Sequence, residues 1–170
     1  MTRARPFPDT ARKIVTLEQV VARAAAWRAR GRCIVYTNGV FDLLHAGHVR
    51  TLEAARRLGD ALVVGVNSDE STRRLKGPGR PLLPAQDRAA LLAALAAVDL
   101  VVIYPETTSM TVLHALRPEI WAKGGDYDPA TVNQEEKAYI ESYGGRVAVV
   151  AHVPGISTTE LVRRMRAAEE

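Results

Sequence analysis

Cysteine is almost absent from the 170-residue chain, which contains only Cys33. A single cysteine cannot form a disulfide within the chain, and it excludes a metal centre built from several thiolates. Because Cys33 lies inside a short apolar segment, we expect a buried, unreactive thiol.

Long hydrophobic segments are missing as well. The sequence has no stretch of about 18 consecutive apolar residues, and residues 1–16 contain no apolar signal-peptide core. We therefore expect a cytoplasmic protein with no membrane partner.

Aromatic residues are scarce, at 5% of the chain, and the formal net charge of +4 is spread over the sequence rather than concentrated in one run. No basic segment is interleaved with aromatic residues, as it is in proteins that stack RNA bases. This pattern favours solvated charged faces together with an anion site, and it predicts no nucleic-acid partner.

Apolar and amphipathic segments alternate regularly along the chain. Strand-like segments cover residues 32–37, 61–66, 99–104, 119–122 and 146–151. Helical patterns cover residues 17–30, 47–58, 84–97, 109–116, 133–143 and 160–168. The alternation predicts an α/β fold, a single Rossmann-like, doubly wound parallel five-stranded sheet with helices on both faces. We expect residues 1–13 to form a flexible N-terminal arm and residues 14–170 to form the α/β domain.

The most informative segment is residues 37–48, TNGVFDLLHAGH. It follows an apolar strand, contains Gly39 in a tight turn, and enters the start of a helix, where backbone N–H groups and the helix dipole favour a phosphate. His45 and His48 are three residues apart and project from the same side of the first turn. Gly47 has no side chain to block a ligand. The segment predicts a polyanion site, with a helix cap as the structural alternative for either histidine.

Polar residues and glycines follow four of the five predicted strands. Ligands of open parallel sheets bind beyond the carboxyl ends of the strands, so these residues are expected to meet. They are Thr37, Asn38, Gly39, Phe41, Asp42, His45 and His48 after the first strand, Asn67, Asp69 and Lys76 after the second, Lys123, Gly124, Gly125 and Asp126 after the fourth, and Ser157, Thr158 and Thr159 after the fifth. The combination predicts binding of nucleotide phosphates.

Several motifs in this order resemble the cytidylyltransferase-like nucleotidyltransferase superfamily, which carries an HxGH motif. They are residues 37–48, VNSDE at 66–70, RLKG and RP within 74–81, KGGDY at 123–127 and GISTTE at 155–160. Within the superfamily, the chain looks most like the adenylyltransferases of ADP-heptose synthesis, which act on heptose 1-phosphate. The resemblance extends over residues 33–166.

The resemblance implies roles for individual residues. His45 and His48 would bind the triphosphate and stabilise charge at the α-phosphorus, and Lys76 would approach the phosphates from a loop. Asp42 would contact the acceptor or support the turn, and its structural alternative is a helix cap. Arg88 would brace the site, and its structural alternative is a surface ion pair. The implied nucleotide-binding residues are Thr37, Asn38, Gly39, Phe41, Gly47, Arg88, Lys123, Gly124, Gly125, Asp126, Ser157, Thr158 and Thr159, and the implied substrate-binding residues are Asp42, Asn67 and Asp69.

The resemblance also implies a reaction. The sugar phosphate would attack ATP in line and release pyrophosphate, without a covalent enzyme intermediate. Mg²⁺ would arrive with ATP, because the sequence offers no cluster of carboxylates for a dedicated metal site. A homodimer is a further implication.

Two other functions fit parts of the sequence. A glycerol-3-phosphate cytidylyltransferase that uses CTP shares GVFDLLHAGH and GISTT. The KGGDY segment favours ATP, as does the absence of an arginine at 151–154. A non-catalytic nucleotide-binding regulator of the same fold is the second alternative.

Overall fold

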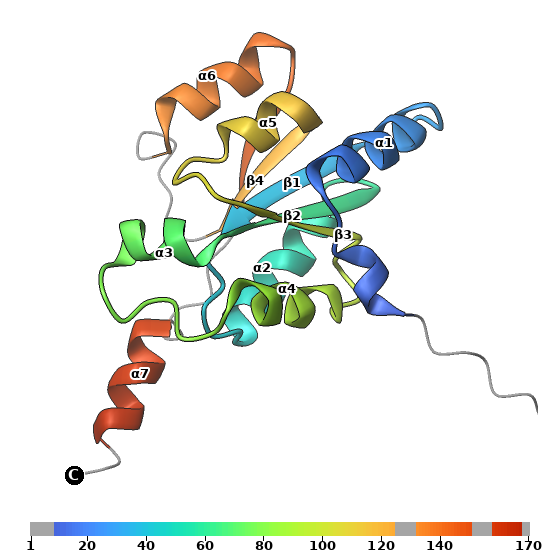
Figure 1. Ribbon diagram of the computed structural model, residues 1–170. Coiled ribbons are helices and arrows are strands. Elements are labelled where there is room, and N and C mark those ends of the chain that lie inside the picture. Colours follow the sequence, from blue (N-terminus) through green and yellow to red (C-terminus); the bar gives the residue numbers. More distant parts are fainter. Residues whose placement is uncertain (1–8, 125–131, 151–157, 168–170) are drawn as a thin grey trace, which may run out of the picture.

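The computed structural model describes residues 9–124, 132–150 and 158–167. They form one five-stranded, entirely parallel sheet with the strand order β3-β2-β1-β4-β5 (Figure 1). The strands are β1 (Ile34–Gly39), β2 (Ala61–Asn67), β3 (Leu100–Tyr104), β4 (Ile120–Gly124) and β5 (Arg146–Val150). The predicted Rossmann-like, doubly wound fold is therefore confirmed.

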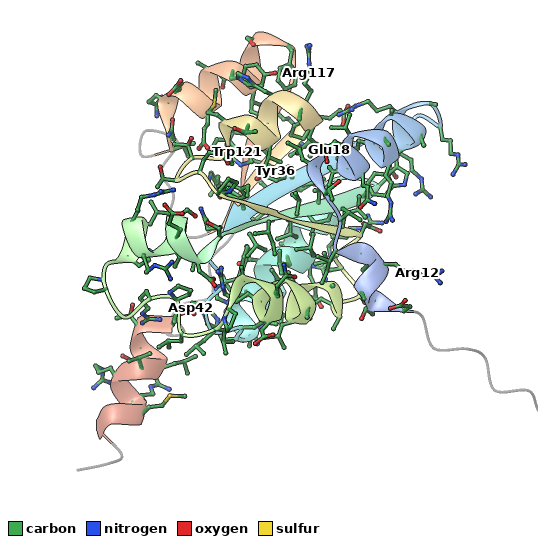
Figure 2. All side chains as sticks on the ribbon, viewed as in Figure 1. Arg12, Glu18, Tyr36, Asp42, Arg117 and Trp121 are labelled. Atoms are coloured by element: carbon green, nitrogen blue, oxygen red, sulfur yellow. The ribbon has the colours of Figure 1, made fainter. Side chains whose placement is uncertain are left out.

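Helices cover both faces of the sheet (Figure 1). The helices of the described residues are α1 (Leu17–Arg28), α2 (Ala46–Arg56), α3 (Asp69–Lys76), α4 (Ala85–Ala93), α5 (Met110–Leu116), α6 (Gln134–Ser142) and α7 (Thr158–Ala167), and α7 stands apart from the sheet. One core lies between the sheet and α1, α5 and α6, and the other lies between the sheet and α2 and α4. Figure 2 shows Tyr36 and Trp121 on the first of these sides.

Adjacent strand residues serve opposite cores. Val35 packs with Leu52 of α2, whereas the next residue, Tyr36, packs with Leu113 of α5. Side chains alternate across a strand, so a sheet covered on both faces needs apolar residues at every position. β2 is buried along its whole length, which is why its residues are apolar or glycine up to Val66.

The strand order reverses beside β1. From β1 the chain builds outward through β2 to β3, and then crosses back to add β4 and β5 on the other side. The carboxyl ends of β1 and β4 therefore lie side by side at the point where open parallel sheets bind their ligands. This switch point positions the site described below.

Part of the predicted N-terminal arm is regular structure. Thr10–Lys13 form a 3-10 turn, η1. Lys13 Nζ donates to the carbonyl oxygens of Leu95 at 3.0 Å and Val98 at 2.7 Å. These carbonyls lie more than 80 residues away along the chain, so no local sequence pattern could indicate the contact.

Candidate active site

A cleft of about 870 Å³ opens at the carboxyl ends of β1 and β4. Most of the predicted site residues line it, namely Thr37, Asn38, Gly39, Phe41, Asp42, His45, Gly47, His48, Asn67, Lys76, Lys123, Gly124, Thr158 and Thr159. Asp69 and Arg88 do not line it, and Gly125, Asp126 and Ser157 lie outside the described residues. Polar residues predicted at the ends of different strands therefore lie together in one cleft.

The two histidines lie together at the start of α2. His45 is the N-cap of the helix, and its Nδ1 accepts a hydrogen bond from the backbone N–H of His48 at 3.3 Å. Their rings stack, with centroids 3.8 Å apart and planes 22° from parallel. A neutral imidazole that accepts at Nδ1 carries its proton on Nε2. The cap therefore leaves His45 with a donor nitrogen suited to a phosphate oxygen.

The turn before the histidines is shaped by Phe41 and Gly39. Phe41 adopts a left-handed backbone conformation with φ of 51°, which is uncommon outside glycine. Its ring packs edge-on against His48, with centroids 5.3 Å apart. A Cβ on Gly39 would come within 3.2 Å of the same ring. Glycine at this position lets Phe41 fold back and support His48.

Asp42 fastens the loop that follows α3. Its Oδ2 accepts from the Arg80 guanidinium at 2.6 Å, and its Oδ1 accepts from the backbone N–H groups of Leu82 at 2.6 Å and Leu83 at 3.1 Å. The side chain is only 5% exposed. These bonds hold the 77–83 loop, and the two roles predicted for Asp42, contact with the acceptor and support of the turn after the first strand, stay predictions.

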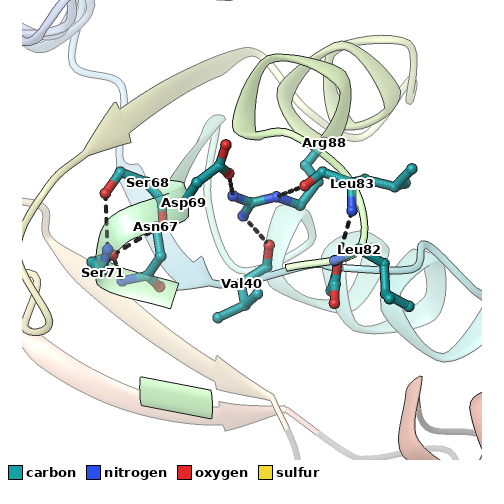
Figure 3. Close-up of polar contacts among 9 residues, drawn as sticks. Val40, Asn67, Ser68, Asp69, Ser71, Leu82, Leu83 and Arg88 are labelled. Atoms are coloured by element: carbon teal, nitrogen blue, oxygen red, sulfur yellow. Dashed lines mark hydrogen bonds and ion pairs between the residues drawn. The ribbon is translucent and has the colours of Figure 1, made fainter. Parts of the chain in front are cut away.

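Arg88 and Asp69 bind each other (Figure 3). The fully buried guanidinium of Arg88 donates to Asp69 at 2.6 Å, to the Val40 carbonyl at 2.6 Å and to the Leu83 carbonyl at 2.9 Å. Neither residue lines the cleft, and the direct ligand contacts predicted for Asp69 and Arg88 stay predictions. Bracing, the other role implied for Arg88, matches these contacts.

A hydrogen-bonded chain connects four strand ends. Asn38 Oδ1 accepts from Trp121 Nε1 and from Lys123 Nζ, both at 3.1 Å, and Asn38 Nδ2 donates to the Tyr104 hydroxyl at 3.2 Å. That hydroxyl donates to Asn67 Oδ1 at 3.0 Å. Burial raises the pKa of Tyr104 to about 12, so the hydroxyl keeps its proton. The two asparagines hold the floor of the cleft rigid as well as lining it.

Lys123 is a buried cation in this floor. Burial lowers its pKa to about 8, an effect that the carboxylate of Glu136 partly opposes. The ammonium group lies 4.1 Å from the centre of the Trp121 ring. A bound phosphate would raise this pKa again, since an opposite charge nearby favours the ionised form.

Gly124 allows α2 to approach the end of β4. A Cβ at this position would collide with the methyl group of Thr51, which also lines the cleft. The glycine predicted to line a nucleoside pocket therefore has a packing function too.

Several residues that line the cleft were absent from the sequence prediction. They are Val40, Thr51, Leu75, Arg80, Thr107, Thr108, Asn133 and Glu136. Thr107 and Thr108 follow the third strand, and the strand-end argument applied there would have found them. Asn133 and Glu136 reach the cleft from the start of α6, and only the packing of that helix brings them there.

The fold and the cleft define the class: a Rossmann-like α/β protein with a polar cleft at its switch point. The chain belongs to the cytidylyltransferase-like family, whose family model matches residues 36–164. The resemblance seen in the sequence motifs is thereby confirmed.

Curated relatives are identical to the chain at about half of the aligned positions. It is 55% identical to the bifunctional protein HldE of Syntrophotalea carbinolica over 81% of the chain and 28% of that protein. It is 52% identical to the bifunctional protein HldE of Pelobacter propionicus over 92% of the chain and 32% of that protein. The chain thus spans about a third of the length of these relatives.

Solved structures agree with the fold. A lipopolysaccharide core biosynthesis protein from Thermoplasma volcanium is 33% identical and has a TM-score of 0.60, covering 74% of this chain and all of that one. Pantothenate synthetase from Thermus thermophilus, at 18% identity, has a TM-score of 0.65 over 91% of this chain and 70% of that one, which shows a shared fold. Within the described ranges, each helix is too short or too polar to cross a bilayer.

Proposed function

We propose that the chain is a nucleotidyltransferase that transfers AMP from ATP to a sugar 1-phosphate, heptose 1-phosphate, giving ADP-heptose and pyrophosphate. One observation carries the proposal: the stacked pair His45 and His48 shares a cleft with Lys76, Thr158 and Thr159. Imidazole, ammonium and hydroxyl donors beside two helix N-termini suit a triphosphate. The identity of about half to the HldE proteins supports the choice of reaction.

The reaction is a single in-line displacement. An oxygen of the sugar phosphate forms a bond to the α-phosphorus of ATP, and the bond from that phosphorus to the bridging oxygen breaks, so that pyrophosphate leaves with the electron pair. The protein contributes mainly positioning and electrostatic stabilisation.

Each described group has a role in that displacement. Nε2–H of His45 and the neighbouring His48 donate to the oxygens of the α-phosphoryl group, where charge develops. Thr158 and Thr159 at the start of α7 hold the departing pyrophosphate, and Lys76 neutralises its charge. One such donor contributes roughly 3 kcal/mol to the stability of the transition state.

Mg²⁺ belongs to the nucleotide in this proposal. Groups of three or more metal-binding side chains are absent from the described part of the chain. Asp42 and Glu136, two carboxylates of the cleft, already accept hydrogen bonds from Arg80 and Ser109. The ion would therefore be held by triphosphate oxygens. The homodimer and the cytoplasmic location implied by the resemblance stay predictions.

A crossed substrate panel tests the proposal. ATP, CTP and GTP are each combined with heptose 1-phosphate and with glycerol 3-phosphate, and pyrophosphate release is measured. We expect turnover with ATP and heptose 1-phosphate. Pyrophosphate formed only from CTP and glycerol 3-phosphate, or from no pair, contradicts the proposal.

A further inference from the structure

Glu136 is a buried carboxylate that faces the cleft. It is 4% exposed and reaches the cleft from the first turn of α6. Its Oε1 accepts two hydrogen bonds from Ser109, one from the backbone N–H at 2.6 Å and one from the hydroxyl at 2.8 Å. Both donors converge on the same oxygen. Oε2 accepts none of the hydrogen bonds found among the described residues.

The Glu136 side chain is largely buried, but Oε2 is not one of the fully buried polar atoms without a partner, so it is open to a donor from the cleft. A carboxylate oxygen in such surroundings favours a hydrogen-bond donor, because an unsatisfied charge of low solvent exposure is costly. A phosphate cannot supply one, since two anions repel each other. A hydroxyl group can. The residues beside Glu136 in the cleft, Thr107, Thr108 and Asn133, are polar and uncharged, which suits a neutral polyol.

The cleft is therefore divided by charge. His45, His48 and Lys76 provide hydrogen-bond donors to the cleft, and Glu136 provides a carboxylate whose charge acts on Lys123. A ligand with phosphates at one end and hydroxyls at the other matches both parts.

We propose that Oε2 of Glu136 accepts a hydrogen bond from a sugar hydroxyl of a bound substrate, and that Glu136 is a specificity-determining residue of the site. The inference rests on the proposed function. Two substrates offer that chemistry, the ribose of the nucleotide and the sugar of the acceptor, and the experiment separates them.

The contact with Ser109 also links α6 to the start of α5, so a purely structural role must be separated from ligand binding. Glu136→Gln makes the separation. The glutamine carbonyl oxygen accepts both Ser109 bonds, and an NH₂ donor replaces Oε2. The glutamine amide cannot adopt the flipped orientation, with its NH₂ group toward Ser109, because the backbone N–H of Ser109 cannot accept a hydrogen bond from NH₂. Glu135→Gln, on the exposed neighbour in the same helical turn, is the matched control.

The assay measures kcat and KM for both substrates in the wild type and the two variants. ATP is compared with 2′-deoxy-ATP and 3′-deoxy-ATP, and heptose 1-phosphate is compared with sugar 1-phosphates that each lack one hydroxyl. Loss of a hydrogen bond to a charged acceptor corresponds to a rise in KM of about 10-fold or more. We expect that rise for one substrate alone in Glu136→Gln, with kcat nearly unchanged and the control unaffected.

The deoxy analogues identify the hydroxyl. One of them should bind the wild type about tenfold more weakly than its parent, and the same analogue should lose no further affinity in Glu136→Gln. A wild type that accepts every deoxy analogue equally well overturns the inference, whether or not the variant folds. Unchanged KM values in Glu136→Gln, or equal rises for both substrates, also overturn it. A wild type with no turnover on any pair overturns the proposed function and this inference together.

Discussion

Arg88 ties α4 to the turn after β1, to the end of the 77–83 loop and to the start of α3, through Val40, Leu83 and Asp69. Replacing it by methionine keeps most of the side-chain volume and removes every donor. The carbonyls of Val40 and Leu83 would then be left without this donor, at a cost of about 1–3 kcal/mol each. Asp69 is 37% exposed and regains water, so its share is small.

The expected loss in the free energy of unfolding is about 2–6 kcal/mol, which is the sum for two carbonyls that each lose their donor. Arg88→Lys should lose less stability than Arg88→Met, because the ammonium group keeps the charge. It should still be less stable than the wild type, because an ammonium group cannot reach three acceptors in a fork. The matched control is Arg57→Met. Arg57 forms an exposed pair with Glu53 at 3.6 Å, and its loss should change stability by less than about 0.5 kcal/mol.

Urea denaturation followed by circular dichroism measures these differences. The midpoint of Arg88→Met should fall well below that of the wild type while the slope stays the same. A loss of less than about 1 kcal/mol would refute the reasoning, because it would mean that the two carbonyls find other partners at no cost.

Three further perturbations test other parts of the site. Asp42→Asn keeps an acceptor for the backbone of the 77–83 loop but loses the ion pair with Arg80, so limited proteolysis should cut this loop faster than in the wild type. An unchanged rate of cleavage contradicts the idea that the Asp42–Arg80 pair holds the loop. Gly124→Ala should destabilise the protein by about 1–3 kcal/mol through the collision with Thr51, and the added Thr51→Ser change, which deletes the methyl group, should recover most of that loss in urea denaturation. Lys123 has its pKa lowered to about 8 in the folded chain from a reference of 10.5, so the unfolded chain binds more protons between these values. The stability of the wild type relative to Lys123→Met should therefore rise between pH 8 and pH 10.5, by at most about 3 kcal/mol, and a flat or falling difference would contradict the burial of this charge.

The fold could be predicted because each element carries its own signal. Buried strands must be apolar at every position, and helices must be amphipathic, so alternation along the sequence was enough to give the layers. Boundaries were less certain: the first strand, expected at 32–37, runs from Ile34 to Gly39. Its last residues are polar or glycine because they form the site, which hides the strand from a search for apolar residues.

The site was predictable to the extent that it follows strand ends. His45, His48 and Lys123 are found this way, because parallel strands deliver their carboxyl ends to one edge. The contacts of Asp42 with Arg80 and of Arg88 with Asp69 depend instead on how a loop and two helices pack. Glu136 likewise reaches the cleft only through the packing of α6. Such pairings join residues 19 or more positions apart, and no spacing rule in the sequence indicates them.

His45 provides the most direct test of the central claim, that the imidazoles at the start of α2 stabilise charge on the α-phosphoryl group. Asparagine is a good N-cap, so His45→Asn preserves the bond to the His48 N–H, and it removes the imidazole ring with its stacking on His48 and the nitrogen assigned to phosphate. Measured by pyrophosphate release from ATP and heptose 1-phosphate, kcat should fall at least about 100-fold while the thermal midpoint stays near that of the wild type. A folded His45→Asn variant with a kcat close to the wild-type value would contradict the claim.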